Sequence, residues 1–254
     1  MQGRGQGQRQ AYDRGTTIFS PDGRLYQVEY AREAVKQGSA SIGVRTVDGV
    51  VLLVDARNPS LLLERESIEK LHKADDHIGI ASAGHVADGR RIIDFARQRA
   101  QLNRLQYEEP IGVEILTKQI CDEMHEYTQV GRGRPFGVAL IIGGIENDQP
   151  RLYETDPSGT PREWAALAIG AGRNEIQAFL EDHYSDQLSL EAGIDVAFRA
   201  LASVKDEPQS PEDVGIATID VESKQYRELP DDEIREHLDS LDLPDDGSHD
   251  EREG

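Results

Sequence analysis

Residues 12–39 read YDRGTTIFSPDGRLYQVEYAREAVKQGS and combine a polar lead, a turn and an amphipathic segment. The sequence Ser-Pro-Asp-Gly at residues 20–23 predicts the turn. Ser20 and Pro21 are also a helix-start signal, because a hydroxyl can cap free N–H groups and proline fits a first helical turn. The stretch therefore predicts an amphipathic helix over Leu25–Lys36 that ends at Gly38. Its apolar stripe is Leu25, Val28, Ala31 and Val35.

The composition limits both the size of the fold and the kind of partner. A chain of 254 residues forms one large domain or two small ones. Its 28 basic and 48 acidic residues give a net charge of −20. Such a surface repels phosphates, which argues against nucleic-acid and anionic-membrane partners. Because salt screens self-repulsion, the charge also predicts a protein that works in high salt, from a halophilic and most simply archaeal source.

The sequence offers little cofactor, redox or membrane chemistry. The single cysteine, Cys121, cannot form an internal disulfide, which fits a reducing cytoplasm. There is neither a long apolar run nor a charged-then-apolar leader, so we expect no membrane span and no secretion signal. The histidines form no metal-ligand pattern, and we place His72 and His77 on a surface loop or strand end. We expect no metal and no cofactor.

Strand-like and helix-like patterns alternate along the rest of the chain. Strands are predicted at residues 39–46, 49–55, 78–83, 137–145, 151–155, 164–169, 214–221 and 225–228. Helices are predicted at residues 86–105, from Pro110 to 127, at 174–183, at 190–203 and at 233–241. This order fits an α+β fold with two sheets and helices on both outer faces, but periodicity alone also allows other α+β layouts.

Two further patterns are interpreted as structural. Cys121 flanks the apolar face of the second long helix, where packing is the simplest role for it. The run Gly170-Ala171-Gly172-Arg173-Asn174-Glu175 resembles a dinucleotide loop. Glu175, however, would place a carboxylate against a phosphate, so we expect a tight turn before a helix. No G-x-x-x-x-G-K loop occurs, which argues against an ATPase.

Both chain ends have the composition of unstructured segments. Residues 2–10 contain only glycine, glutamine and arginine. From Asp231 onward the chain carries eleven acidic and two basic residues. We therefore expect a mobile segment at 1–12, one domain at 13–240 and a disordered acidic tail at 241–254.

Residues 12–39 closely resemble the N-terminal signature of proteasome α subunits. The likeness continues through SIEK at 67–70, YTQ at 127–129 and RPFGVALIIGG at 134–144. It implies a four-layer αββα sandwich of the N-terminal-nucleophile hydrolase type, with an extra N-terminal helix. It further implies a cytoplasmic, non-catalytic subunit of seven-membered α rings, and the helix at 25–36 is expected to contribute to a contact between subunits or rings.

The same resemblance implies partners and site residues. The partners are other α subunits, proteasome β subunits, AAA-type regulatory ATPases and unfolded protein substrates. Tyr12, Asp13, Pro21 and Tyr30 match the cluster that braces the N-terminal gate at the ring's pore.

A second group of matches concerns a docking pocket. Gly38 and Lys70 match the pocket that receives the C-terminal tails of the ATPases, where a lysine suits a terminal carboxylate. His85 stands where related chains often carry leucine, so the shape and pH response of this pocket differ from the family pattern.

The alternative is a catalytic β-type subunit exposed by autolysis. Thr16 follows a glycine, as in β precursors, but a helix rather than a strand comes next. Ser39 does precede the right hairpin, and on that register Asp55 and Lys70 resemble the acidic and lysine partners. Ser39 nevertheless follows 38 residues, so no free amine is available as the base. We therefore expect no catalytic residue, and a free-standing enzyme built on the same residues ranks lowest.

Overall fold

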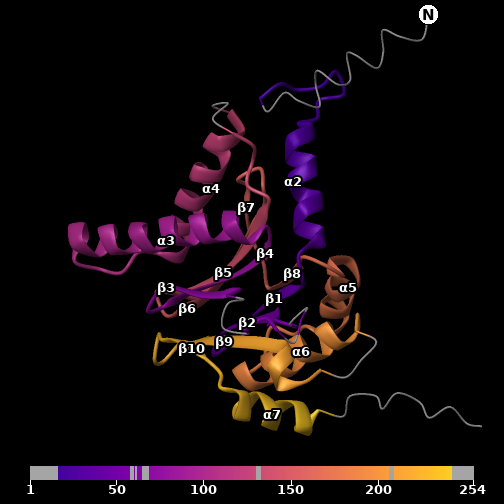
Figure 1. Ribbon diagram of the computed structural model, residues 1–254. Helices are drawn as coiled ribbons and strands as arrows, with labels where there is room; N and C mark the ends of the chain where they lie inside the picture. Colours follow the sequence, from indigo (N-terminus) through magenta and orange to yellow (C-terminus); the bar gives the residue numbers. More distant parts are fainter. Residues whose placement is uncertain are drawn as a thin grey trace, which may run out of the picture.

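Two antiparallel five-stranded sheets stack face to face between layers of helices in the computed structural model of the chain (Figure 1). The structure describes residues 17–57, 60, 62–64, 69–129, 133–205 and 209–241. The strands are β1 Ser41–Arg45, β2 Gly49–Asp55, β3 Leu71–Asp75, β4 Ile78–Gly84, β5 Val138–Glu146, β6 Gln149–Thr155, β7 Pro161–Glu163, β8 Ala166–Ile169, β9 Val214–Asp220 and β10 Tyr226–Glu228. The strand orders are β10-β9-β2-β1-β8 and β3-β4-β5-β6-β7.

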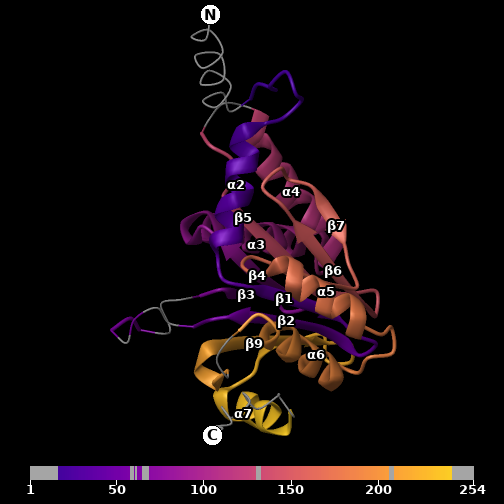
Figure 2. The same cartoon turned by 90° about the vertical axis from the view of Figure 1, so that its right-hand side faces the viewer.

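Helices cover both outer faces of the paired sheets. They are α2 Tyr26–Gln37, α3 Val86–Tyr107, α4 Val113–Gln129, α5 Arg173–His183, α6 Leu190–Ala202 and α7 Asp231–Ser240. As Figure 2 shows, α3 and α4 lie on one side, α5 and α6 lie on the other, and α7 lies beyond α6. The predicted αββα sandwich with an extra N-terminal helix is therefore confirmed.

Alternation along the strands builds three apolar layers. In β2, Val51 and Leu53 pack with the helices of the first sheet, whereas Val50, Leu52 and Val54 pack between the two sheets. The third layer joins the second sheet to α3 and α4 and includes Ile80, Ile92, Ile120 and Leu140. Burying one such side chain contributes roughly 1.5–3 kcal/mol, so these layers are the main source of stability.

The apolar stripe of α2 is buried within this chain. Val28, Ala31 and Val35 are 3%, 8% and 7% exposed, and α2 packs against β4 and β5. On its other side, Arg32 pairs with Asp156 at 2.7 Å. The stripe already has a partner surface, so it gives no reason to assign α2 to a contact between subunits or rings. The contact itself stays a prediction.

The start of α2 also differs from the prediction. Ser20 does not cap the helix. Its Oγ accepts the Arg24 N–H at 3.1 Å, and its carbonyl accepts the Gly23 N–H at 2.8 Å. The helix begins at Tyr26, after an N-cap residue, Leu25, without a side-chain capping bond. The local turn therefore uses the hydrogen-bonding capacity that the helix-start signal assigned to a cap.

The strands β3 and β7, which the sequence analysis missed, are the two edges of the second sheet. Edge strands are often polar and short, and the sequence LHKAD of β3 has no apolar alternation. Placing His72 and His77 on the surface was wrong, because they are 7% and 9% exposed. His72 lies in β3, and the Nε2 of His77 lies 2.8 Å from the carbonyl oxygen of Ile111.

The predicted structural roles of Cys121 and of the glycine-rich turn are confirmed. Cys121 is 2% exposed on α4, and burial raises the pKa of its thiol to about 12. Gly170 and Gly172 have φ values of 87° and 68° directly before α5, in the left-handed region that favours glycine.

The packed domain reaches slightly further than predicted. Leu241 is 8% exposed and belongs to the apolar layer beside α6 and α7. Residues 1–16 and 242–254 lie outside the described residues, and with them lie the predicted mobile segment and almost all of the predicted acidic tail. Among the described residues, no helix combines the length and the apolar character needed to cross a membrane.

Candidate functional site

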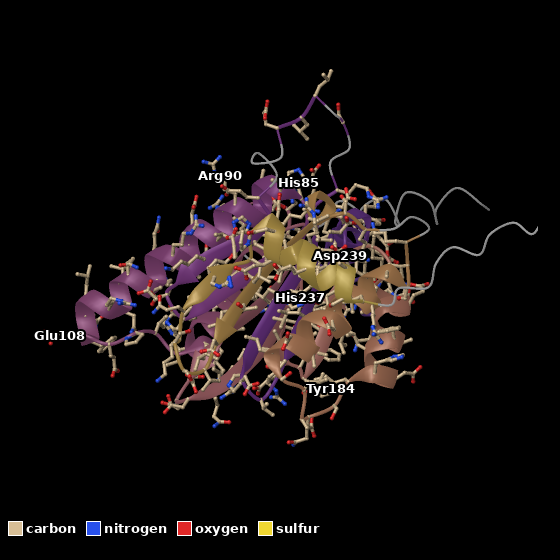
Figure 3. The ribbon with its side chains drawn as sticks, turned by 90° about the horizontal axis from the view of Figure 1, so that it is seen from below. His85, Arg90, Glu108, Tyr184, His237 and Asp239 are labelled. Atoms are coloured by element: carbon tan, nitrogen blue, oxygen red, sulfur yellow. The ribbon has the colours of Figure 1, made fainter. Side chains whose placement is uncertain are left out.

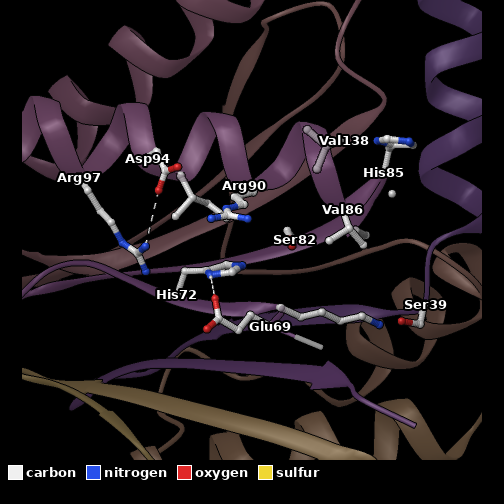
Figure 4. Close-up of a pocket in the computed structure, with 14 residues that line it drawn as sticks. Ser39, Glu69, His72, Ser82, His85, Val86, Arg90, Asp94, Arg97 and Val138 are labelled. Atoms are coloured by element: carbon white, nitrogen blue, oxygen red, sulfur yellow. Dashed lines mark ion pairs between the residues drawn. The ribbon is translucent and has the colours of Figure 1, made fainter. Parts of the chain in front are cut away.

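A pocket of about 430 Å³ lies between the start of α3 and the start of β3 (Figure 4). Lys70 and His85, which the resemblance assigns to one docking pocket, both line it. Lys70 directly precedes β3, and His85 is the N-cap residue of α3. The β3–β4 hairpin brings them together, and the Ser82 N–H donates to the Lys70 carbonyl at 3.1 Å.

Gly38 does not line the pocket but lies directly behind Gly84, which does. A Cβ atom at Gly38 would stand 2.3 Å from the backbone nitrogen of Gly84. Gly84 has a φ of 117°, and a Cβ atom there would stand 2.3 Å from the carbonyl oxygen of Gly137. Only glycine lets the end of α2 pass this close to the end of β4. Gly38 therefore shapes the pocket wall through its backbone.

Ser39, Asp55 and Lys70 do meet, but their contacts are not those of a nucleophile and its base. The Ser39 Oγ donates to the carbonyl oxygen of Asp55 at 3.0 Å, and the Lys70 Nζ donates to the same oxygen at 2.6 Å. The Asp55 carboxylate instead pairs with Lys205 at 2.5 Å. The hydroxyl proton thus points at a backbone carbonyl, which is not a general base.

The Lys70 ammonium is arranged to receive an anion. Burial lowers its pKa most, Asp55 raises it, and the nearby Lys205 lowers it further. An ammonium has three N–H donors, and within the described part of the chain only one of them is used, on the Asp55 carbonyl. A carboxylate entering the pocket would accept a hydrogen bond from a second N–H of Lys70 and stabilise its charged ammonium form.

Asp88 holds the wall of the pocket beside His85. Its carboxylate accepts the Arg134 Nη2 at 2.9 Å and the Gly137 N–H at 2.8 Å. Burial raises the pKa of Asp88, but these bonds outweigh burial and the net shift is downward. The His85 Nδ1 lies 3.6 Å from the same carboxylate, and the His85 side chain is 56% exposed. His85 is therefore accessible to solvent and held near a fixed negative charge.

The four predicted gate residues are only partly described. Tyr12 and Asp13 lie outside the described residues. Pro21 lies in the turn before α2, and Tyr30 is 51% exposed on that helix. The Tyr30 ring stacks on Tyr26 with the ring centroids 6.4 Å apart. The phenol of Tyr30 is thus presented at the surface, on the helix that follows the N-terminal segment.

Sequence reasoning missed several residues of this region. His72, Arg90 and Arg97 line the pocket from two elements. Arg90 and Arg97 could have been predicted from the sequence, because residues 86, 90, 94 and 97 share one face of the predicted helix. Lys205 had no such signal, because it lies 150 residues from Asp55 in sequence. Among the described residues, no group of three histidine, cysteine or acidic side chains could hold a metal ion.

Comparison with known proteins gives two family matches that together span most of the chain. The family described as "Proteasome subunit" matches residues 35–219. The N-terminal signature of A-type proteasome subunits matches residues 12–34. The second match includes all four predicted gate residues.

Relatives from halophilic archaea match over nearly the whole length. The proteasome α subunit of Natronomonas pharaonis is 65% identical, over 98% of this chain and 99% of its own. The proteasome α subunit 1 of Haloarcula marismortui is 66% identical, over 96% of this chain and 94% of its own. The protein of the same name from Haloferax volcanii is 62% identical, over 94% of this chain and 95% of its own.

Proposed function

The chain belongs to the proteasome subunit family as an α-type member, and on this premise we propose that it is a non-catalytic subunit of the outer rings of the core particle. Seven copies form a ring that stacks on β subunits, which carry the peptidase sites. The ring works in the cytoplasm and admits unfolded protein substrates. The acidic surface supports a role without nucleic-acid or membrane partners.

One observation supports the absence of catalysis most directly. Ser39, at the position that resembles the nucleophile, is internal, and its hydroxyl donates to the Asp55 carbonyl at 3.0 Å. A nucleophile of this class needs a free α-amino group beside it. The alternative β-type function requires cleavage before Thr16 or Ser39. The intact mass of the purified, assembled subunit tests it, because a chain beginning at either residue would support the alternative.

The N-terminal segment is proposed to gate substrate entry. Pro21 fixes the turn before α2, and Tyr30 lies exposed on that helix; we propose, as the resemblance implies, that both act with Tyr12 and Asp13 to brace the open segment. We expect deletion of residues 1–12 to speed casein hydrolysis by the assembled core in high salt, with little change in the cleavage of a small peptide. If deletion abolished both activities in a properly assembled particle, the terminus would belong to the chemistry.

The pocket at Lys70 and His85 is proposed to receive the C-terminal tail of a regulatory ATPase. The ammonium of Lys70 is partly buried and, among the described residues, uses only one of its donors, which suits a terminal carboxylate. We expect Lys70→Gln to remove ATPase-stimulated casein hydrolysis while small-peptide hydrolysis by the core alone persists. Stimulation that survived this substitution would place the docking site elsewhere.

A further inference from the structure

The pocket concentrates positive charge in an acidic protein. Its lining carries three cations, Lys70, Arg90 and Arg97, against two anions, Glu69 and Asp94. The chain as a whole has a net charge of −20. A local surplus of cations on such a background attracts anionic ligands and repels cationic ones. Besides Lys70, an arginine of this lining can bind such a ligand only if protein atoms do not already hold its guanidinium.

Arg97 is already held by protein atoms. Its Nε donates to the carbonyl oxygen of Lys73 at 3.0 Å, and its Nη1 lies 3.8 Å from Asp94 Oδ1. Arg91, the neighbour of Arg90, is committed elsewhere, since it stacks over the Tyr127 ring at 4.9 Å.

Arg90 is different, because within the described part of the chain it forms no hydrogen bond, ion pair or ring contact. Figure 4 shows its guanidinium reaching from α3 toward His72 and Ser82, inside the pocket. Burial lowers the pKa of His72 to about 4, so this wall is uncharged at neutral pH and does not compete for an anion. Seen from the side of α7, Arg90 and His85 lie at the same edge of the molecule (Figure 3).

Lys70 and Arg90 line the same pocket, Lys70 directly before β3 and Arg90 near the start of α3, so one ligand can contact both. An extended peptide advances about 3.3 Å per residue. A chain end held at Lys70 therefore brings a side chain two to four residues upstream within reach of the guanidinium, whose fork suits a carboxylate.

We propose that Arg90 is a second anion-recognition point, which binds an acidic side chain two to four residues before the carboxyl end of the docking tail. This inference rests on the proposed docking function and specifies the chemistry of the partner. Glu69, one of the two negative charges of the same pocket, acts against it; its side chain is 73% exposed and lies 3.9 Å from His72. Arg90 thus favours an acidic side chain in the docking tail, and Glu69 disfavours it.

The test uses the assembled core built with the full-length chain and short fluorescent peptides with a free carboxyl end. The peptides are otherwise uncharged and carry Asp or Asn at the second, third or fourth position from the end. Affinities are measured by anisotropy at one KCl concentration. At the preferred position, we expect the Asp peptide to bind about tenfold more tightly than the Asn peptide. Arg90→Gln removes this preference, whereas Arg99→Gln, on the same helix, keeps it.

The outcomes separate this inference from the docking proposal. If Asp and Asn peptides bind wild type equally, or if Arg90→Gln keeps the preference, the second recognition point is wrong while docking stands. If no peptide binds, the docking proposal fails and the inference falls with it. Glu69→Gln is the gain-of-affinity variant, and we expect it to strengthen Asp-peptide binding more than Asn-peptide binding. Unaltered Asp-over-Asn selectivity in Glu69→Gln would contradict its role.

Discussion

At the scale of single residues, His72 shows how burial converts an ionisable group into a neutral wall. Its ring is enclosed between β3 and α3, and burial is the main cause of its lowered pKa of about 4, with Arg97 adding to the effect. Glu69 and Asp94 act in the opposite direction but do not compensate. The pocket thereby keeps a hydrogen-bonding group on its wall without adding a fourth positive charge to Lys70, Arg90 and Arg97.

This shift predicts a pH dependence of stability. His72 is protonated below about pH 6.5 in the unfolded chain but only below about pH 4 in the folded chain. Its contribution to the free energy of unfolding is therefore fully present above pH 6.5 and is lost as the pH falls toward 4. The expected loss is about 3 kcal/mol. We expect His72→Gln to lose less stability over this pH range. The free energy of unfolding of the full-length chain, measured by urea unfolding at several pH values, tests this. The exposed His85→Gln is the control. Equal pH slopes in wild type and His72→Gln would refute the prediction.

At the scale of elements, the junction of α2 with the end of β4 has no room for a side chain. Gly38 meets Gly84, and Gly84 meets Gly137, and in each case an added Cβ would stand 2.3 Å from a backbone atom. Backbone atoms cannot move aside as the end of a flexible side chain can. This contact positions α2 relative to the pocket that Lys70 and His85 line.

A pair of glycine substitutions tests this junction. Gly38→Ala forces α2 away from β4, and we expect it to cost about 2 kcal/mol or more of unfolding free energy. Gly89→Ala is the matched control inside α3, where the nearest atom to the new Cβ is 3.6 Å away. Helix propensity predicts that this change is neutral or stabilises by up to about 1 kcal/mol. Thermal unfolding of both variants decides the matter, and equal stability would contradict the steric account.

At the scale of the whole molecule, charge dominates the behaviour. The net charge of −20 is spread over a 254-residue chain, and the proposed seven-membered ring would multiply it. The screening length is about 3 Å in 1 M salt and about 10 Å in 0.1 M salt, so repulsion between copies grows on dilution. We therefore expect assembly to require high salt.

We expect the assembled particle to dissociate when KCl is lowered from multimolar concentrations to about 0.1 M, as followed by light scattering and circular dichroism. Residues 242–254 contain six acidic residues and one basic residue, so deleting them changes the net charge from −20 to −15. The shortened chain should therefore stay assembled down to a lower salt concentration. An intact particle at low salt, or an unchanged salt midpoint after the deletion, would count against the electrostatic explanation.

Most of the strands and helices could be predicted from the sequence, because the periodicity of apolar residues is a local property of the sequence. Central strands such as β2 and β5 are nearly continuous apolar runs, and α4 repeats its apolar residues at helical spacing. The edge strands β3 and β7 were not predicted, since they are short, lack apolar alternation and are recognisable as strands only by pairing with β4 and β6. Ser20 was assigned to the helix because a turn and a cap use the same residue types.

Composition, the signature stretch and the resemblance along the rest of the chain by themselves determined the family, the acidic character and the candidate residues Lys70 and His85. Only the tertiary structure decided how these residues act. It joins Lys70 to the Asp55 carbonyl, brings Lys205 across 150 residues to the carboxylate, and leaves Arg90 in the pocket without a partner among the described residues. Such relations depend on which strand and helix ends meet in space, and the separation of residues along the chain does not encode that.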